Sequence, residues 1–389
     1  MAKDIAILSG VRTPFGRAIK GGFKDTRPDT LAELVICEAL KRAPGIKPEE
    51  IGDVVLGCAM PEAEQGMNVA RVAALGAGLP SSVAAMTINR FCSSGVQSIS
   101  IIADRIAAGA FEVGLAGGVE SMTMIPMGGN KVSLNPTIVD RHPEVFTPMG
   151  VTAENIARAH GISRADQDAF ALRSHQRATA AQASGKFAPE LMPVKTAIFD
   201  AEDHLRELTV DKDEGPRADT TLEKLATLRP AFDPTGTVTA GNSSPLTDGA
   251  AAVVVASGER ARALGIKPLG WFRHFAVAGV PPEVMGIGPV PAVRKVLAQA
   301  GLSIDQIDLF ELNEAFAAQS LYCARELGIP EEKLNVNGGA IALGHPLGVS
   351  GTRLTLTILH ELQRRNGRYG IVTMCVGGGM GAAAIVERA

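Results

Sequence analysis

The feature that most constrains the fold of this 389-residue chain is an internal repeat. Separated blocks match at one constant spacing of 256 residues: 45–51 with 301–307, Ser94-Gly95 with Ser350-Gly351, and Gly114 with Gly370. Chance matches do not share one offset, so the spacing indicates a duplicated unit. Apolar runs that alternate between strand and helix periodicity indicate that the unit is α/β.

A further match shows where the two halves differ. Residues 249–255 resemble 381–386 at a spacing of 132, so the first half carries about 124 extra residues before its last strand. Because insertions over one face of a fold often bind ligands, we expect a substrate-binding role for it. The predicted units are a first half at 1–119 and 249–270, an inserted loop domain at 120–248, and a second half at 271–389.

Local patterns place the elements that matter for chemistry. In the first half we predict strands at 5–8, 54–58, 83–88 and 113–116, and helices at 30–40, 66–75 and 96–108. In the second half we predict strands at 308–310 and 371–374 and a buried helix at 352–362, and the insertion is expected to be helical through 152–185.

Cys92 is the first candidate for a catalytic role. It lies in a turn of small residues, 89–95, directly before a helical pattern. Free N–H groups and the helix dipole at such a start favour a negative sulfur, so a nucleophilic thiolate is one expectation for Cys92. The alternative is a small buried apolar residue, which is the role expected for Cys37, Cys58 and Cys323.

Three loops of the second half follow predicted strands and carry polar residues. They contain Asn313, His345 within a Gly-rich stretch at 337–348, and Cys375. Ligand sites in open α/β sheets gather at the carboxyl ends of strands, so these residues can converge with Cys92. Gly344 and Pro346 hold His345 in a loop with no apolar face to fill. The other histidines are assigned to loops and helices without a role: 142, 160, 175, 204, 274 and 360.

Composition excludes several functional classes. Five cysteines without paired spacing, and no clustered Cys/His set, predict a reducing compartment and no metal site. A net charge of −3 and 4% aromatic residues give no reason to expect a nucleic-acid partner, although a local basic patch for a phosphorylated ligand stays open. With no apolar run of membrane-spanning length and a charged N-terminus, we expect a cytoplasmic protein without membrane insertion.

These motifs together resemble the thiolase family over essentially the whole chain. The carrying stretches are 89–95, 313–317, 338–346 and 375–381. The resemblance implies a duplicated, five-layered α/β/α/β/α core with an inserted loop domain. Cys-Ser-Ser-Gly from Cys92, with 120–122, 148–150 and 241–244, is most similar to the degradative 3-ketoacyl-CoA thiolases, whereas biosynthetic members more often show Cys-Gly-Ser-Gly.

The resemblance also implies a role for each candidate. Cys92 would carry the acyl group after His345 takes its proton, and Cys375 would move protons to the enolate and from CoA. The N–H groups of Cys92 and Gly377 would stabilise the oxyanion of the tetrahedral intermediate on Cys92. His345 and a water held by Asn313 would stabilise the enolate oxygen. Ser244 would hold pantetheine and Arg217 the adenosine phosphates. Met149, Met285 and Phe316 would line the acyl pocket. For Met285 and Phe316, an ordinary role in the hydrophobic core is almost equally compatible with the sequence.

The implied activity is CoA-dependent cleavage of 3-ketoacyl-CoA to acetyl-CoA and a shortened acyl-CoA, by ping-pong kinetics, in fatty acid β-oxidation. Acyl-CoA and CoA would be substrates, with no permanently bound cofactor or metal, and the chain would form a homodimer or homotetramer. The alternative is condensation of two acetyl-CoA to acetoacetyl-CoA. Chain length and physiological direction stay open.

Three other classes fit the motifs less well. A decarboxylating ketoacyl synthase usually shows two histidines, or a histidine and an asparagine, in place of the second cysteine, so Cys375 argues against it. A thiolase-like binding protein without catalysis would lack one of the four polar candidates, and all four are present. A nicotinamide oxidoreductase would rest on the glycines at 377–381 alone, and the residues after them leave no room for the helix and strand that such a site needs.

Overall fold

The computed structural model describes residues 4–389, and its main feature is a ten-stranded sheet. The strand order is β10-β11-β12-β9-β1-β8-β5-β3-β4, with the short β2 paired to β8. The strands of this sheet are β1 (Ile5–Arg12), β2 (Gly16–Arg17), β3 (Ile51–Gly57), β4 (Ala84–Ile88), β5 (Val113–Ser121), β8 (Thr247–Ser257), β9 (Gly270–Gly279), β10 (Leu309–Leu312), β11 (Tyr369–Val376) and β12 (Met380–Arg388).

The duplication is visible in the order and direction of these strands. β1-β8-β5-β3 and β9-β12-β11-β10 follow the same sequence of antiparallel, antiparallel and parallel pairs. The two halves meet where β1 and β9 pair, at Ala6 with Trp271 and Ile7 with Gly270. β5 and β11 begin at Val113 and Tyr369, which preserves the 256-residue spacing.

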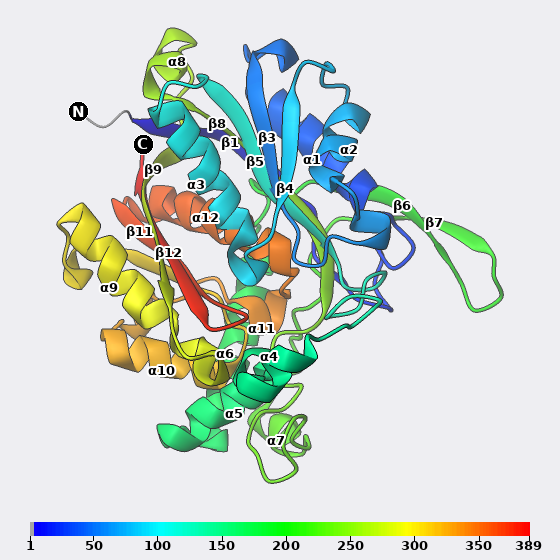
Figure 1. Ribbon diagram of the computed structural model, residues 1–389, viewed down its shortest axis with the longest axis vertical. Helices are drawn as coiled ribbons and strands as arrows, with labels where there is room; N and C mark the ends of the chain where they lie inside the picture. The colour runs from blue at the N-terminus through cyan, green and yellow to red at the C-terminus, as the bar shows by residue number, and fades with distance from the viewer. Residues whose placement is uncertain (1–3) are drawn as a thin grey trace.

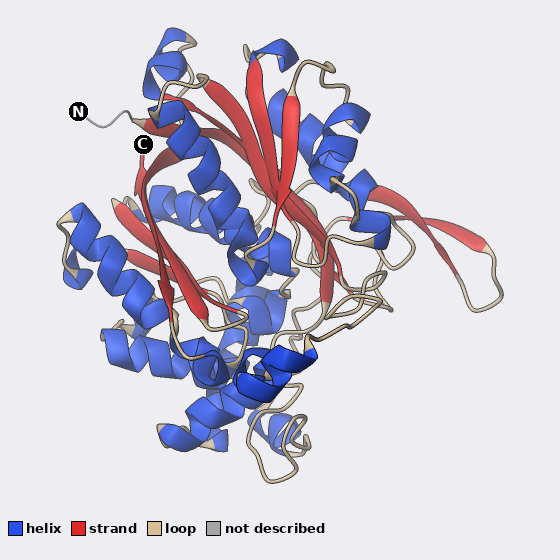
Figure 2. Cartoon of the chain, viewed as in Figure 1, coloured by secondary structure: helices blue, strands red, loops and turns tan. Residues whose placement is uncertain are grey.

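Helices complete five layers (Figure 1). α3 and α12 pack against each other between the two halves of the sheet, and their apolar residues join the inner faces of both halves in one core. α1 and α2 cover the outer face of the first half of the sheet. α9 and α10 cover the outer face of the second half (Figure 2). The predicted fold class is therefore confirmed. These helices are α1 (Pro28–Lys41), α2 (Val69–Gly76), α3 (Ser94–Ala107), α9 (Pro289–Ala300), α10 (Ala317–Leu327) and α12 (Leu347–Arg365).

The segment between β5 and β8 spans 122–246 and leaves and re-enters the sheet at neighbouring strands, where Glu120 pairs with Gly249. The helical stretch predicted at 152–185 is two helices, because the chain turns at Gly161, whose backbone is in the left-handed region.

A β-hairpin that was not predicted, β6 with β7, projects from the body of the molecule in Figure 1. The division into three units stays a prediction. The segment contains α4 (Pro136–Arg141), α5 (Met149–Ala159), α6 (Arg164–Ala183), β6 (Val194–Phe199), β7 (Leu205–Val210) and α7 (Leu222–Ala226); α8 (Gly258–Ala263) and α11 (Ala340–Leu343) lie beyond it.

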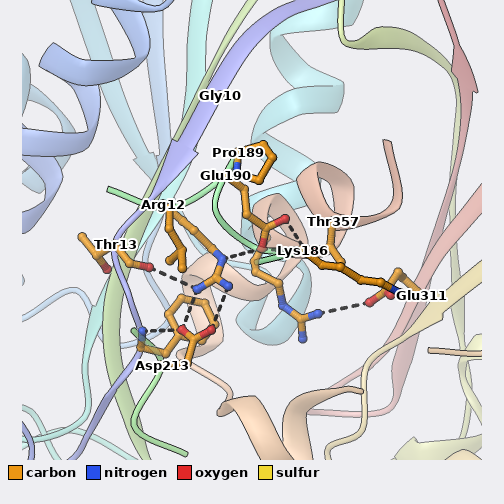
Figure 3. A network of polar contacts seen from close by, with 12 residues as sticks. Gly10, Arg12, Thr13, Lys186, Pro189, Glu190, Asp213, Glu311 and Thr357 are labelled. Atoms are coloured by element: carbon orange, nitrogen blue, oxygen red, sulfur yellow. Dashed lines mark hydrogen bonds and ion pairs between the residues drawn. The ribbon is translucent and has the colours of Figure 1, made fainter. Parts of the chain in front are cut away.

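A buried polar network fastens this segment to both halves (Figure 3). The Arg12 guanidinium, on β1, donates to both oxygens of Asp213 at 2.6 and 2.9 Å and to Glu190 at 2.7 Å. Glu190 also accepts from the Thr357 hydroxyl on α12 at 2.9 Å. Removing one partner of such a buried pair typically costs about 3–5 kcal/mol, because the other charge stays buried without compensation.

Candidate active site

Cys92 lies in a one-turn helix, Phe91–Ser93, that leads directly into α3. Side chains of the same turn hold its backbone: the side-chain Oδ1 of Asn89 accepts from the Phe91 N–H, and the Ser94 hydroxyl accepts from the Arg90 N–H. Phe91 has a φ of 42°, a left-handed conformation that costs energy for a residue with a side chain. These bonds therefore present Cys92 in a constrained turn, buried to 1% exposure.

The charge state of Cys92 differs from the one expected of a cysteine at a helix start. Burial raises its pKa to about 12, despite hydrogen bonds to the sulfur from the N–H groups of Gly377 and of Cys92 itself, and the nearby Glu120 carboxylate acts in the same direction as burial. Loss of hydration outweighs the helix terminus at this site. Cys92 is a thiol at neutral pH and needs a base. Of the three cysteines predicted to be core, Cys58 and Cys323 are buried, but Cys37 is exposed on α1.

Cys375 and Gly377 come from the end of β11 in the second half. Cys375 is fully buried, and its pKa is raised first by burial and then by the proximity of Cys92. The turn of Cys92 packs against β11, and the Gly377 N–H is close enough to the Cys92 sulfur to lower its pKa. A Cβ at position 377 would make only ordinary contacts with the protein, at 3.5 Å from the Phe91 ring.

His345 lies between α11 and α12 and is held at both ring nitrogens. Its Nδ1 is 2.5 Å from the Ser350 hydroxyl, which itself donates to the Pro346 carbonyl oxygen at 3.1 Å. Nδ1 must then carry the proton, leaving the lone pair on Nε2. Burial, with a smaller contribution from the Arg353 charge, lowers the pKa of His345 to about 3. The imidazole is therefore neutral and able to accept a proton at Nε2.

Asn313 meets His345 at that nitrogen. It follows β10 directly, and its N–H donates to the Thr373 carbonyl oxygen on β11 at 2.9 Å. Its Nδ2 lies 3.2 Å from His345 Nε2. Its Oδ1 is buried and has no hydrogen-bond partner among residues 4–389, so it is free to bind a polar group. The structure thus places Asn313 against His345, and it places Cys92 near Cys375 and Gly377.

The predicted acyl-pocket residues lie against Cys375. Met285 and Phe316 are buried in one apolar cluster with the Cys375 side chain, and Met149 is half-buried against the same cluster. Phe232, a residue that we did not single out, packs edge-on against Phe316 with 5.9 Å between ring centroids. Flexible methionines and aromatic rings around a cysteine form a surface that accepts apolar chains.

A pocket of about 510 Å³ opens beside this cluster, since its lining residue Ser243 pairs with Phe316. Arg217 lines it, as does His175, whose Nδ1 accepts from the Arg217 N–H at 3.2 Å. Ser244 is not among the lining residues, although its neighbours Ser243 and Pro245 are; its N–H donates to the Ala315 carbonyl oxygen at 3.0 Å. Ser244 therefore lies where the pocket meets the apolar cluster.

Sequence reasoning missed part of this pocket. His175 was assigned no role, but it is buried, and burial followed by the charges of Arg217 and Arg17 lowers its pKa to about 4. Arg17, Lys20 and Lys224 also line the pocket; Lys224 pairs with the lining residue Asp219, and the other cations, with Arg217, make the pocket basic. They come from segments far apart in the sequence, so no local spacing could have grouped them.

Within residues 4–389, no group of three or more His, Cys, Asp or Glu side chains is arranged to hold a metal ion. No helix in that part of the chain is long and apolar enough to cross a membrane.

Comparison with known families covers nearly the whole chain. Residues 5–259 match the family described as "Thiolase, N-terminal domain", and residues 266–388 match "Thiolase, C-terminal domain". The chain belongs to the thiolase family. The family predicted from the four motifs is confirmed.

Individual thiolases are similar along their full length. The 3-ketoacyl-CoA thiolase of Bacillus subtilis (strain 168) is 54% identical over 389 residues, covering 99% of both chains. The human peroxisomal 3-ketoacyl-CoA thiolase is 46% identical over 99% of this chain and 91% of its own length. The crystal structure of the Bacillus anthracis acetyl-CoA acetyltransferase superposes with a TM-score of 0.89 at 42% identity, covering 99% of both chains.

Proposed function

We propose that this thiolase is an acetyl-CoA C-acyltransferase that cleaves 3-ketoacyl-CoA with CoA in fatty acid β-oxidation. The observation that carries the proposal is the meeting of the Cys92 thiol, the Cys375 thiol and the Gly377 N–H beside an apolar cluster. Two thiols with different neighbours suit a reaction that needs both a nucleophile and a separate acid. The similarity to proteins named 3-ketoacyl-CoA thiolase supports the same reaction.

In the first half-reaction, His345 Nε2 takes the Cys92 proton and the sulfur attacks the 3-keto carbon. The N–H groups of Cys92 and Gly377 are the donors for the resulting oxyanion, a role in which one donor is typically worth about 100-fold or more in rate. The bond between C2 and C3 then breaks. The acetyl-CoA enolate leaves, stabilised by His345 and by a water on Asn313, and takes the Cys375 proton.

In the second half-reaction, CoA gives its thiol proton to the Cys375 thiolate and attacks the acyl group on Cys92. The Cys92 thiolate leaves and recovers its proton from His345. Each residue ends in its starting state, so proton transfer balances over the cycle. A thiol is a suitable acid and base here because its partners, a CoA thiol and an α-carbon, have comparable pKa values.

For substrate binding, we assign the acyl chain to the cluster of Met149, Met285 and Phe316. The pantetheine arm passes Ser244, and the phosphates lie in the basic pocket near Arg217. We further propose that the enzyme is cytoplasmic and forms a homodimer or homotetramer, without a permanently bound cofactor; light scattering on a sizing column measures the assembly.

A second activity, condensation of two acetyl-CoA to acetoacetyl-CoA, is supported by the likeness to a protein titled acetyl-CoA acetyltransferase. The experiment that separates the two is a profile of CoA-dependent cleavage rates for 3-ketoacyl-CoAs from four to sixteen carbons. Activity over several chain lengths is expected for the degradative enzyme. Activity confined to the four-carbon substrate would overturn that assignment.

A further inference from the structure

Glu120 is a buried carboxylate near the end of β5 that the reaction scheme does not use. It is 1% exposed and accepts hydrogen bonds at both oxygens. Oε2 accepts from the N–H groups of Ala59 and Gly348, each at 2.8 Å. Oε1 accepts from the Gln65 amide at 2.8 Å and the Met60 N–H at 3.2 Å. One side chain thus connects β5, the loop after β3 and the start of α12.

The contact with Gly348 bears directly on the catalytic base. Gly348 is the second residue of α12, three positions after His345, and its N–H is one of those that a helix start leaves without an internal partner. A negative charge there is also favoured by the helix dipole. Glu120 therefore fixes the turn of α12 that follows His345.

Close packing makes this position of α12 sensitive to small shifts. A Cβ at position 118, on the same strand as Glu120, would lie 1.9 Å from the Gly348 carbonyl oxygen, and one at Gly95 would lie 2.9 Å from it. Only glycines allow the second-half helix to approach the first-half strand and α3 this closely. Leu347, the first residue of α12, packs in one cluster with Cys92.

We propose that Glu120 is a positioning residue that holds the start of α12, and with it His345, in register with Cys92 across the boundary between the two halves. The proposal rests on the proposed function, in which His345 takes the Cys92 proton.

Two variants separate geometry from charge. Glu120→Gln keeps the shape, but an amide has one oxygen where the carboxylate has two, so either orientation leaves two N–H donors unpaired. Glu120→Asp keeps the charge but is one methylene shorter and withdraws from Gly348. We expect both variants to lower kcat by about 10- to 100-fold, as small displacements of a catalytic group do. The KM for CoA should stay within about twofold of the unmodified value.

The readout that a purely structural role would not move is the rate at which Cys92 is alkylated at pH 8. Iodoacetamide labelling is followed by mass spectrometry of the Cys92 peptide, because Cys37 is exposed and also reacts. The thiolate is the form that reacts, and in the proposed function His345 takes the Cys92 proton, so a displaced His345 should slow the labelling of Cys92. We expect labelling to be about tenfold slower in both Glu120→Gln and Glu120→Asp. Alkylation needs no CoA, so it tests Glu120 even if the unmodified enzyme proves inactive in thiolysis.

Glu154→Gln is the matched control. Glu154 is also a buried carboxylate that accepts from backbone N–H groups, those of Thr237 and Val238, but it lies in the inserted segment. The rate of Cys92 labelling in Glu154→Gln should be unchanged. An unmodified kcat in both Glu120 variants, or an unmodified rate of Cys92 labelling in both, would overturn the proposal. If Glu120→Gln does not fold, the kcat of Glu120→Asp decides alone.

Discussion

Replacing Ser350 by alanine tests whether the Ser350 hydroxyl sets the tautomer of His345, the catalytic base. The Ser350 hydroxyl is the acceptor for His345 Nδ1–H at 2.5 Å, inside a buried site. Without it, the proton on Nδ1 has lost its partner, and the tautomer with the proton on Nε2 becomes favoured. That tautomer cannot take the Cys92 proton.

The size of the effect follows from the burial. Leaving a buried donor unpaired costs about 1–3 kcal/mol. At about 1.36 kcal/mol for each factor of ten, this predicts a loss of about 5- to 150-fold in the rate of Cys92 acylation. The loss should appear in single-turnover acylation by a 3-ketoacyl-CoA, measured by quenched flow, and in kcat/KM.

Thr355→Ala is the matched control, on the same helix. Thr355 is fully buried, and its hydroxyl donates to the Gly351 carbonyl oxygen at 2.8 Å, four residues back, just as Ser350 donates to Pro346. Both variants lose a buried hydroxyl and should lower the free energy of unfolding, but only Ser350→Ala should slow acylation. Acylation at the unmodified rate in Ser350→Ala, or an equal loss in both, would refute the tautomer argument.

Three further outcomes are expected. Cys92→Ala should abolish CoA-dependent cleavage, and intact-mass measurement should find an acyl group on the unmodified enzyme alone; an acylated Cys92→Ala protein would contradict the nucleophile assignment. Arg217→Ala should raise the KM for CoA about tenfold with kcat within about twofold, because it holds a non-reacting part of the substrate; Arg206→Ala, on the exposed hairpin, should change neither. Burial lowers the pKa of His345 to about 3, against about 6.5 when unfolded, so the unfolded chain binds more protons between these values. The free energy of unfolding should therefore fall as pH drops from about 6.5 towards 3, and less steeply in His345→Gln; equal urea-melt slopes in the two proteins would exclude this contribution.

The strands, the middle helices and the catalytic candidates could be predicted from the sequence because their signals are local or periodic. Each catalytic candidate stands in a short motif beside a predicted strand or helix end. The duplication then related the two halves, since a repeated unit must place equivalent strands in equivalent positions. The β6–β7 hairpin was missed because its strands pair only with each other and are mostly not buried, so no regular alternation of apolar and polar residues marks them.

Charge states could not be predicted in the same way. The position of Cys92 at a helix start indicated a thiolate, yet its pKa is raised because desolvation outweighs the helix terminus. Burial of a whole turn depends on α12 and β11, which are distant in sequence. The unpaired Oδ1 of Asn313 and the tautomer of His345 likewise depend on contacts between separate elements.

By itself, the sequence determined that this protein is a duplicated α/β chain and that Cys92, Asn313, His345 and Cys375 are the residues to follow, because repeats and motifs are properties of spacing along one chain. Only the tertiary structure decided which atoms meet. The Glu120 contact with Gly348, the Arg12 network and the basic pocket all join segments far apart in the sequence. Such contacts arise from packing between layers, and no spacing along the chain records them.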